Sequence, residues 1–360
     1  MKRSRILAVL LLLQLVIDMN KYNFLTLAVL LSLFSQTQGG VLHQGKCRQV
    51  FGNDEVRVIC LHVNFKRLPS KVFPGNTTDL RVHFSNLSSI SSDDLKIFSQ
   101  LRHLSLTRNQ LQTLPADLLE GLCNLYVLDL TGNKLKALHW RVFGLSPIVE
   151  LTLADNLLSE LHADCLPENS SLQRLDLASN RFARLPVAFL QRLGNLQSLD
   201  LKNNQLEELT PGALVSLSKL EALYLENNRL KSLDPSVFIG NPNLQQVFLS
   251  GNRLEILPAG LFLQQKELVF LDLRNNSLLN LPTGMLGGRF HAVLSGNPWH
   301  CDSGLAYLWH WLRLNGKRIF HDDNITCQTP KHMKGRNISE IAATELGIKE
   351  NNSLLGNNDC

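Results

Sequence analysis

The chain has 360 residues, of which 44 % are hydrophobic, 19 % charged and 7 % aromatic, and its formal net charge is +5. Four basic residues and one aspartate in the first 40 residues contribute +3 of that charge, so about +2 remains for the rest. A balance this close to neutral excludes a strongly basic surface for nucleic acid or another polyanion.

Two apolar runs open the chain, at residues 6–17 and 24–34, and a polar stretch separates them. Neither run reaches the ~20 residues that a membrane-spanning helix needs. The second run is preceded by a short basic segment and followed by small residues up to Gly39, as in a secretory signal. We therefore predict a signal peptide within residues 1–40 and a secreted protein without a membrane span. Translation from Met19, one long signal with a polar break and a retained anchor are the alternatives.

A short segment at residues 41–76 contains two cysteines, Cys47 and Cys60, and an alternating apolar pattern leads into the second. The exposed end of a stack of repeats needs a cover, because it presents apolar surface and an unpaired strand edge. We predict a hairpin closed by a Cys47–Cys60 disulfide, which the oxidising compartment of a secreted protein favours. Two free buried cysteines are the alternative.

The pattern L-x-x-L-x-L-x-x-N-x-L recurs at steps of 21 to 24 residues over residues 77–296 and defines a leucine-rich repeat. Eight copies are regular and the first and last are degenerate. The pattern predicts an α/β solenoid with a curved parallel sheet on its concave face and short turns on its convex side. The repeated asparagines are Asn109, Asn133, Asn156, Asn180, Asn204, Asn228, Asn252, Asn276 and Asn297.

These asparagines have a structural role in the prediction. An amide side chain carries donors and an acceptor, so it can bond the buried backbone of its own turn and of the neighbouring turn. Ser85 stands at the corresponding position of the degenerate first repeat.

A different pattern begins at Asn297. Leucines and a tryptophan then recur at helical spacing between Leu305 and Leu312. We predict a C-terminal cap at residues 297–345, with a helix held by a Cys301–Cys327 disulfide, and a polar tail at residues 346–360. The histidines nearby do not have the spacing of a zinc site, so no metal is expected.

Three cysteines remain: Cys123, Cys165 and Cys360. The first two have different positions in their repeats, so a bridge between them is not expected. The protein is predicted to be a monomer, with a Cys360-linked dimer as the alternative. Asn-x-Ser/Thr acceptors predict a glycoprotein. The acceptor asparagines are Asn76, Asn86, Asn169, Asn275, Asn324, Asn337 and Asn351.

Aromatic and charged side chains fall at strand positions that face outward from the concave sheet. Exposed aromatics beside charges are typical of protein contact sites, so we predict a binding face with aromatic anchors. The anchors are Tyr224, Phe248 and Phe270, and their charged neighbours are Arg174, Lys202, Glu226 and Arg274. An interrupted acidic stripe runs through Asp129, Asp176, Asp200 and Asp272. An ordinary solvated face is the alternative.

The segments 296–302, 307–309 and 324–327 resemble the C-terminal cap of the secreted leucine-rich repeat family, and 83–88 resembles a glycosylated first turn in that family. The cap carries the resemblance, because the repeat consensus is widely shared. The resemblance implies a serum glycoprotein that modulates transforming growth factor beta signalling in inflammation and vessel growth. The implied partners are a growth-factor receptor or coreceptor, with cytochrome c as a further ligand.

Other functions are weighed against this one. An extracellular-matrix binding protein or the noncatalytic carrier subunit of a plasma enzyme is the main alternative, and recognition of microbial lipids is a weaker one. No phosphate loop, nucleophile elbow or metal-binding helix motif occurs in the sequence. We therefore predict that the protein is not an enzyme and needs no cofactor.

Overall fold

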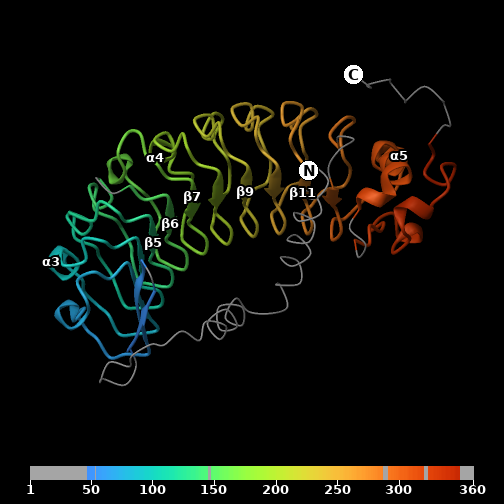
Figure 1. Cartoon of the computed structure of the whole chain (residues 1–360). Coiled ribbons are helices and arrows are strands. Elements are labelled where there is room, and N and C mark those ends of the chain that lie inside the picture. The colour runs from blue at the N-terminus through green and yellow to red at the C-terminus, as the bar shows by residue number, and fades with distance from the viewer. Residues whose placement is uncertain (1–46, 53, 145–146, 287–290, 320–322, 349–360) are drawn as a thin grey trace.

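The computed structural model describes residues 47–52, 54–144, 147–286, 291–319 and 323–348. The predicted signal peptide, the acceptor Asn351 and Cys360, for which a linked dimer is the alternative, lie outside these residues. The described chain forms an arc of stacked repeats that leads from an N-terminal hairpin to a helical C-terminal cap (Figure 1).

Twelve strands form one sheet in sequence order, β1 to β12. Among the strands of the described residues, β1 and β2 pair antiparallel, and every later pair is parallel, one repeat apart. The predicted leucine-rich repeat solenoid is therefore confirmed. The strands are β1 Cys47–Phe51, β2 Val56–Leu61, β3 Asp79–His83, β4 His103–Ser105, β5 Val127–Asp129, β6 Glu150–Thr152, β7 Arg174–Asp176, β8 Ser198–Asp200, β9 Ala222–Tyr224, β10 Gln246–Phe248, β11 Phe270–Asp272 and β12 His291–Val293.

The convex side is built from turns and very short helices, as the prolines there predict. Two helices of four residues, α3 and α4, lie in this layer, whereas α5 belongs to the C-terminal cap. The helices are α3 Ser92–Leu95, α4 Val187–Leu190 and α5 Ala306–Asn315, with 3-10 turns at Ser70–Val72, Ala163–Cys165, Ser303–Leu305, Gly316–Arg318, Lys331–Met333 and Ile338–Glu340. No helix of the described residues is both long and apolar enough for a membrane span.

The repeated asparagines bond the buried turns together. Nδ2 of Asn204 donates to the carbonyl of Leu177 in the preceding repeat (2.9 Å) and to that of Leu201 in its own (3.1 Å). Its Oδ1 accepts from the backbone N–H of Phe182 (3.1 Å). Where Ser85 replaces the asparagine, its hydroxyl still accepts from Val63 N–H (3.1 Å), so part of the ladder survives.

The residue before each repeated asparagine has a positive φ, the left-handed backbone conformation that glycine adopts without steric cost. Gly251 has φ +67°, and a Cβ there would lie 2.2 Å from Oδ1 of Asn227 in the preceding repeat. We expect Gly251→Ala to destabilise the protein by about 1–2 kcal/mol. Gly194→Ala is the control, because a Cβ there meets nothing within 4 Å. Thermal unfolding compares the two variants, and equal midpoints would contradict the expectation.

Both caps are closed by the predicted disulfides, Cys47–Cys60 and Cys301–Cys327. Trp299 is fully buried under the C-terminal cap, and Nε1 of Trp309 in α5 donates to Ile341 O (2.8 Å). Leu346 and Ile348 are also buried in the core cluster that includes the cap, so its packing reaches at least residue 348, the last described residue.

The remaining described cysteines, Cys123 and Cys165, are both unpaired, as predicted. Cys123 is exposed, whereas Cys165 is buried and its Sγ lies 3.5 Å from the carbonyl oxygen of His139. Burial raises the pKa of the Cys165 thiol, so this group is a packed core side chain and not a reactive one.

Candidate functional site

The concave sheet brings residues that lie one repeat apart in sequence into neighbouring positions. Asp176 of β7 pairs with Asp200 of β8, Asp200 with Tyr224 of β9, and Tyr224 with Phe248 of β10. Parallel strands lie about 4.8 Å apart, so side chains in such a row are in contact range. Phe270 lies two positions earlier in its strand than the residue opposite Phe248, and its own register partner is Gln246.

The three predicted aromatic anchors do contact one another. The rings of Tyr224 and Phe248 are stacked with centroids 4.7 Å apart, and those of Phe248 and Phe270 are tilted at 5.0 Å. They form a small apolar cluster with Val293, separate from the main leucine core.

The prediction that all three aromatics are exposed is wrong. Phe248 is 8 % exposed and Phe270 only 2 %, whereas Tyr224 is half-buried. The strand spacing matches the stacking distance of aromatic rings, so each ring covers the next. Tyr224 is therefore the aromatic that a partner could reach, and the two phenylalanines support it from one side.

Three of the four predicted charged residues form ion pairs along the same face. Arg274 forms an ion pair with the fully buried Asp272 (2.8 Å), and Lys202 forms one with Asp200 (3.0 Å). Arg174 pairs with Glu150 on the neighbouring strand. The side chains of Arg174 and Lys202 keep about half of their surface exposed, at 51 % and 43 %. They are thus paired locally but still accessible to a partner.

The carboxylates in the middle of the face are poorly solvated. Burial, and then the charge of Asp200, raises the pKa of Asp176 to about 6. Burial, again followed by Asp200, raises the pKa of Glu226 to about 7, and its Oε2 has no hydrogen-bond partner among the described residues. Burial acts to lower the pKa of Lys202, but the Asp200 carboxylate outweighs it and the pKa is raised. The charged forms of Asp176 and Glu226 are therefore disfavoured at the centre of the concave face.

Sequence reasoning missed a polar network at the N-terminal end of the concave face. Nε2 of His83 lies 2.9 Å from Oγ of Ser105, which donates to Oδ2 of Asp129 (3.1 Å). Burial lowers the pKa of His83 to about 4, so the ring is neutral at physiological pH. The strand register contains the signal for this network, because the three residues fall on the successive strands β3, β4 and β5.

That network is not arranged as a hydrolase triad. The hydroxyl of Ser105 donates its hydrogen bond to Asp129 and accepts one from His83. His83 is therefore not placed to act as a general base on Ser105. No group of three or more potential metal ligands occurs among the described residues.

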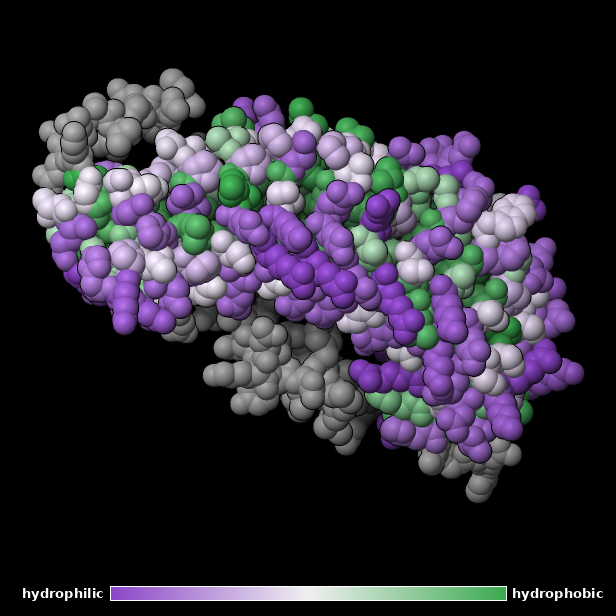
Figure 2. All heavy atoms as spheres, turned by 180° about the vertical axis from the view of Figure 1, so that it is seen from behind, coloured by the Kyte–Doolittle hydropathy of each residue, from purple (hydrophilic) through white to green (hydrophobic). Residues whose placement is uncertain are grey.

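Outside the concave face, exposed apolar side chains recur at steps of 24 residues, at Val215, Ile239 and Leu263. A shallow groove of about 280 Å³ lies between the last two. Figure 2 shows a broad band of hydrophilic side chains across the repeats, with hydrophobic side chains in separate patches along the outer edge.

Five of the six described glycan acceptors are exposed: Asn76, Asn86, Asn169, Asn275 and Asn324. Asn337 is half-buried, and its Oδ1 accepts from the backbone N–H of Ser339 (3.0 Å). Asn275 has φ +52°, and its Oδ1 fills the space beside Gly296.

Known proteins resemble short parts of this chain in sequence. Carboxypeptidase N subunit 2 of Mus musculus is 37 % identical over 57 residues, which is 16 % of this chain and 10 % of that protein. A phospholipase A2 inhibitor of Gloydius brevicaudus siniticus is 34 % identical over 53 residues, or 15 % of this chain and 16 % of that protein. The aligned stretches thus span less than a fifth of these relatives.

Most of the fold has a counterpart among solved structures. A chain of the Toll–Spatzle complex from Drosophila superposes with a TM-score of 0.59 at 24 % identity, covering 79 % of this chain and 47 % of that one. A family model described as leucine rich repeat matches residues 75–135, 123–182, 170–230 and 220–278. These matches cover more than half of the chain, which therefore belongs to the leucine-rich repeat family.

Proposed function

We propose that this chain is a secreted glycoprotein that binds another extracellular protein through the middle of its concave face. The similarity to carboxypeptidase N subunit 2 and to a phospholipase A2 inhibitor, the two disulfides, the predicted signal peptide and the seven glycan acceptors all support an extracellular protein.

The observation that carries the binding proposal is the row across β7, β8 and β9. It places the carboxylate of Asp200 beside the reachable ring of Tyr224 and that of Asp176 one strand further along, and Glu226 follows two residues after Tyr224. A guanidinium or ammonium group of a partner would gain ion pairs there and a cation–π contact with the ring. The partner surface that fits this face is therefore basic with apolar neighbours.

The identity of the partner is a finer proposal. The C-terminal cap resembles that of leucine-rich alpha-2-glycoprotein, and we propose a function of that type: modulation of transforming growth factor beta signalling through a receptor or coreceptor. Cytochrome c, a strongly basic protein, is a second ligand consistent with the acidic row.

The similarity to carboxypeptidase N subunit 2 favours a second candidate, a carrier that binds an enzyme or a matrix protein. Affinity capture from serum with the purified protein, read by mass spectrometry, separates the two. Recovery of receptor ectodomains supports the signalling function, whereas recovery of a carboxypeptidase or collagen supports the carrier function.

Tyr224→Ala is the sharpest test of the binding face. Because Phe248 and Phe270 are buried, changing them would disturb packing more than truncation of Tyr224, which is half-buried and stacks on Phe248 from one side. We expect the affinity for the captured partner to fall at least about tenfold, as for an interface anchor. Tyr126→Ala is the matched control, since that tyrosine is 46 % exposed and lies outside the row. Unchanged affinity for the folded Tyr224 variant would refute the proposed face.

A further inference from the structure

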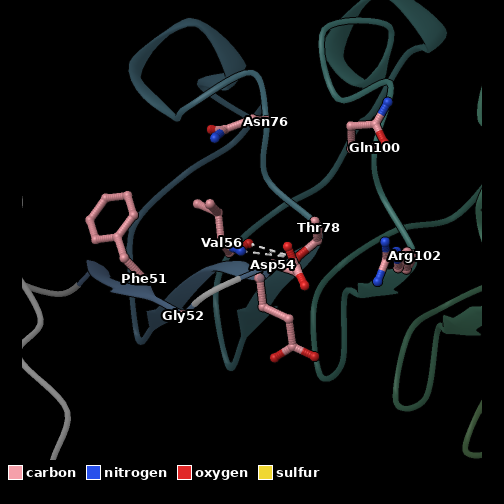
Figure 3. Close-up of a pocket in the computed structure, with 9 residues that line it drawn as sticks. Phe51, Gly52, Asp54, Val56, Asn76, Thr78, Gln100 and Arg102 are labelled. Atoms are coloured by element: carbon pink, nitrogen blue, oxygen red, sulfur yellow. Dashed lines mark hydrogen bonds between the residues drawn. The ribbon is translucent and has the colours of Figure 1, made fainter.

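We propose that an open groove beside the N-terminal hairpin holds the first sugars of an N-linked glycan on Asn76. The groove has a volume of about 570 Å³, within the range of ~300–1,000 Å³ that ligand sites occupy. It lies where the turn between β1 and β2 approaches the chain segments that lead into β3 and β4 (Figure 3). Its lining residues are Phe51, Gly52, Asp54, Glu55, Val56, Asn76, Thr78, Gln100 and Arg102.

The acceptor sequence is fixed at the rim of this groove. Asn76 is exposed, and Thr78, which supplies the hydroxyl of the acceptor, is buried against β2. Oγ1 of Thr78 accepts from the N–H of Val56 (3.0 Å) and donates to its carbonyl (3.2 Å). These two bonds tie the acceptor to the hairpin, so a sugar on Nδ2 of Asn76 must start at the groove.

The groove has the side chains that bind sugars. Phe51 is 51 % exposed, and Figure 3 shows its ring on the same side of the hairpin as the amide of Asn76. The C–H face of a pyranose ring packs well on such an aromatic surface. The side chains of Asp54, Gln100 and Arg102 make no hydrogen bond or ion pair with other described residues, so their polar groups are available to sugar hydroxyls.

A glycan in this place would also protect the end of the sheet. β1 is the outermost strand of the twelve, and its outer edge pairs with no described strand. Exposed edges and apolar residues on them favour aggregation, and proteins commonly cover them. A glycan packed on Phe51 would cover both the edge strand and its exposed ring.

The test uses the secreted protein, made with uniform high-mannose glycans and kept folded. Peptide N-glycosidase releases glycans over time, and mass spectrometry follows each acceptor separately. We expect release from Asn76 to be about two- to tenfold slower than from the exposed Asn169, the protection that one ring contact can give. Phe51→Ala should remove this difference, whereas Val72→Ala, at an equally exposed apolar residue, should leave it.

A second measurement detects the ring contact directly. The glycans are labelled with ¹³C in N-acetylglucosamine, and the signals of the Asn76-linked sugar are assigned in NMR spectra by their loss in Asn76→Gln. Protons of this sugar should be shifted upfield by the ring of Phe51. The upfield shifts should disappear in Phe51→Leu. Thr78 is left intact, because its hydroxyl also bonds β2. An unmodified Asn76, equal release rates, or a Phe51 change without effect would overturn the inference. The inference rests on the proposed function as a secreted glycoprotein. A negative result at Asn76 or Phe51 would nevertheless leave the glycans at the other acceptors and the binding at Tyr224 unaffected.

Discussion

Asn228→Ala is expected to lower the free energy of unfolding by about 2–3 kcal/mol, because it leaves the buried backbone N–H of Leu206 unsatisfied, at ~1–3 kcal/mol, and removes one of the two amide donors from each of two buried carbonyls. Nδ2 of Asn228 donates to the carbonyls of Leu201 (2.9 Å) and Leu225 (3.1 Å). Its Oδ1 accepts from the N–H of Leu206 (3.0 Å). The alanine would also leave space too small and too buried for water to replace all three bonds.

Asn243→Ala is the control for this experiment. It removes an amide of the same type, but one that is exposed and makes a single bond, from Nδ2 to the carbonyl of Ser218 (2.7 Å). We expect this change to cost less than about 1 kcal/mol. Urea unfolding followed by circular dichroism compares the two variants. If Asn228→Ala unfolds at the same urea concentration as Asn243→Ala, the asparagine ladder is not a major source of stability.

The sequence was sufficient to predict the ladder because its period is strict. A 24-residue step, such as that from Asn204 to Asn228, fixes which strand residue lies next to which, and every register pair from β7 to β11 follows it. The disulfides and the cap helix were also predictable, because cysteine position and helical spacing are local signals. The fold therefore follows from the repeat period and from a few residues, such as the cysteines, that mark the ends of the repeat array.

The burial of the candidate site could not be predicted in the same way. The repeat pattern correctly assigns Phe248 to the concave side, but whether a concave side chain is exposed depends on its neighbours across strands. Tyr224, Phe248 and Phe270 shield one another only because three successive repeats carry rings close together. The pattern assigns the face, and the packing of large side chains on adjacent strands decides the exposure.

The missed network of His83, Ser105 and Asp129 has a related cause. Each residue alone looks like an ordinary polar side chain on a solvated face. Their relation appears only when the degenerate first repeat is aligned with the regular ones, and the aromatics that indicate a contact site lie in later repeats. The register of β3, β4 and β5 then places the three in a chain of hydrogen bonds.

Glu226→Gln is expected to make the protein more stable at neutral and higher pH, by about 2–3 kcal/mol at pH 8. The pKa of Glu226 is about 7 in the folded protein, against 4.5 for the unperturbed side chain, because burial and the charge of Asp200 disfavour the carboxylate. The folded state therefore holds a proton that the unfolded state has released between these two values. Stability contributed by Glu226 is full below about pH 4.5 and is lost as the pH rises towards 7.

Glutamine fills nearly the same volume as glutamate and cannot ionise. The variant therefore does not lose stability as the pH rises from 4.5 to 7 in the way that wild type does. The difference in unfolding free energy between Glu226→Gln and wild type should be small near pH 4.5 and grow up to about pH 7 and slightly beyond. Glu221→Gln controls for the removal of a negative charge from an exposed position in the same repeat, and should change stability by less than about 0.5 kcal/mol. A difference that does not change between pH 4.5 and 8 would show that the pKa of Glu226 is the same in the folded and the unfolded protein. The same carboxylate would then be compensated already within the face, and a basic partner would gain little from it.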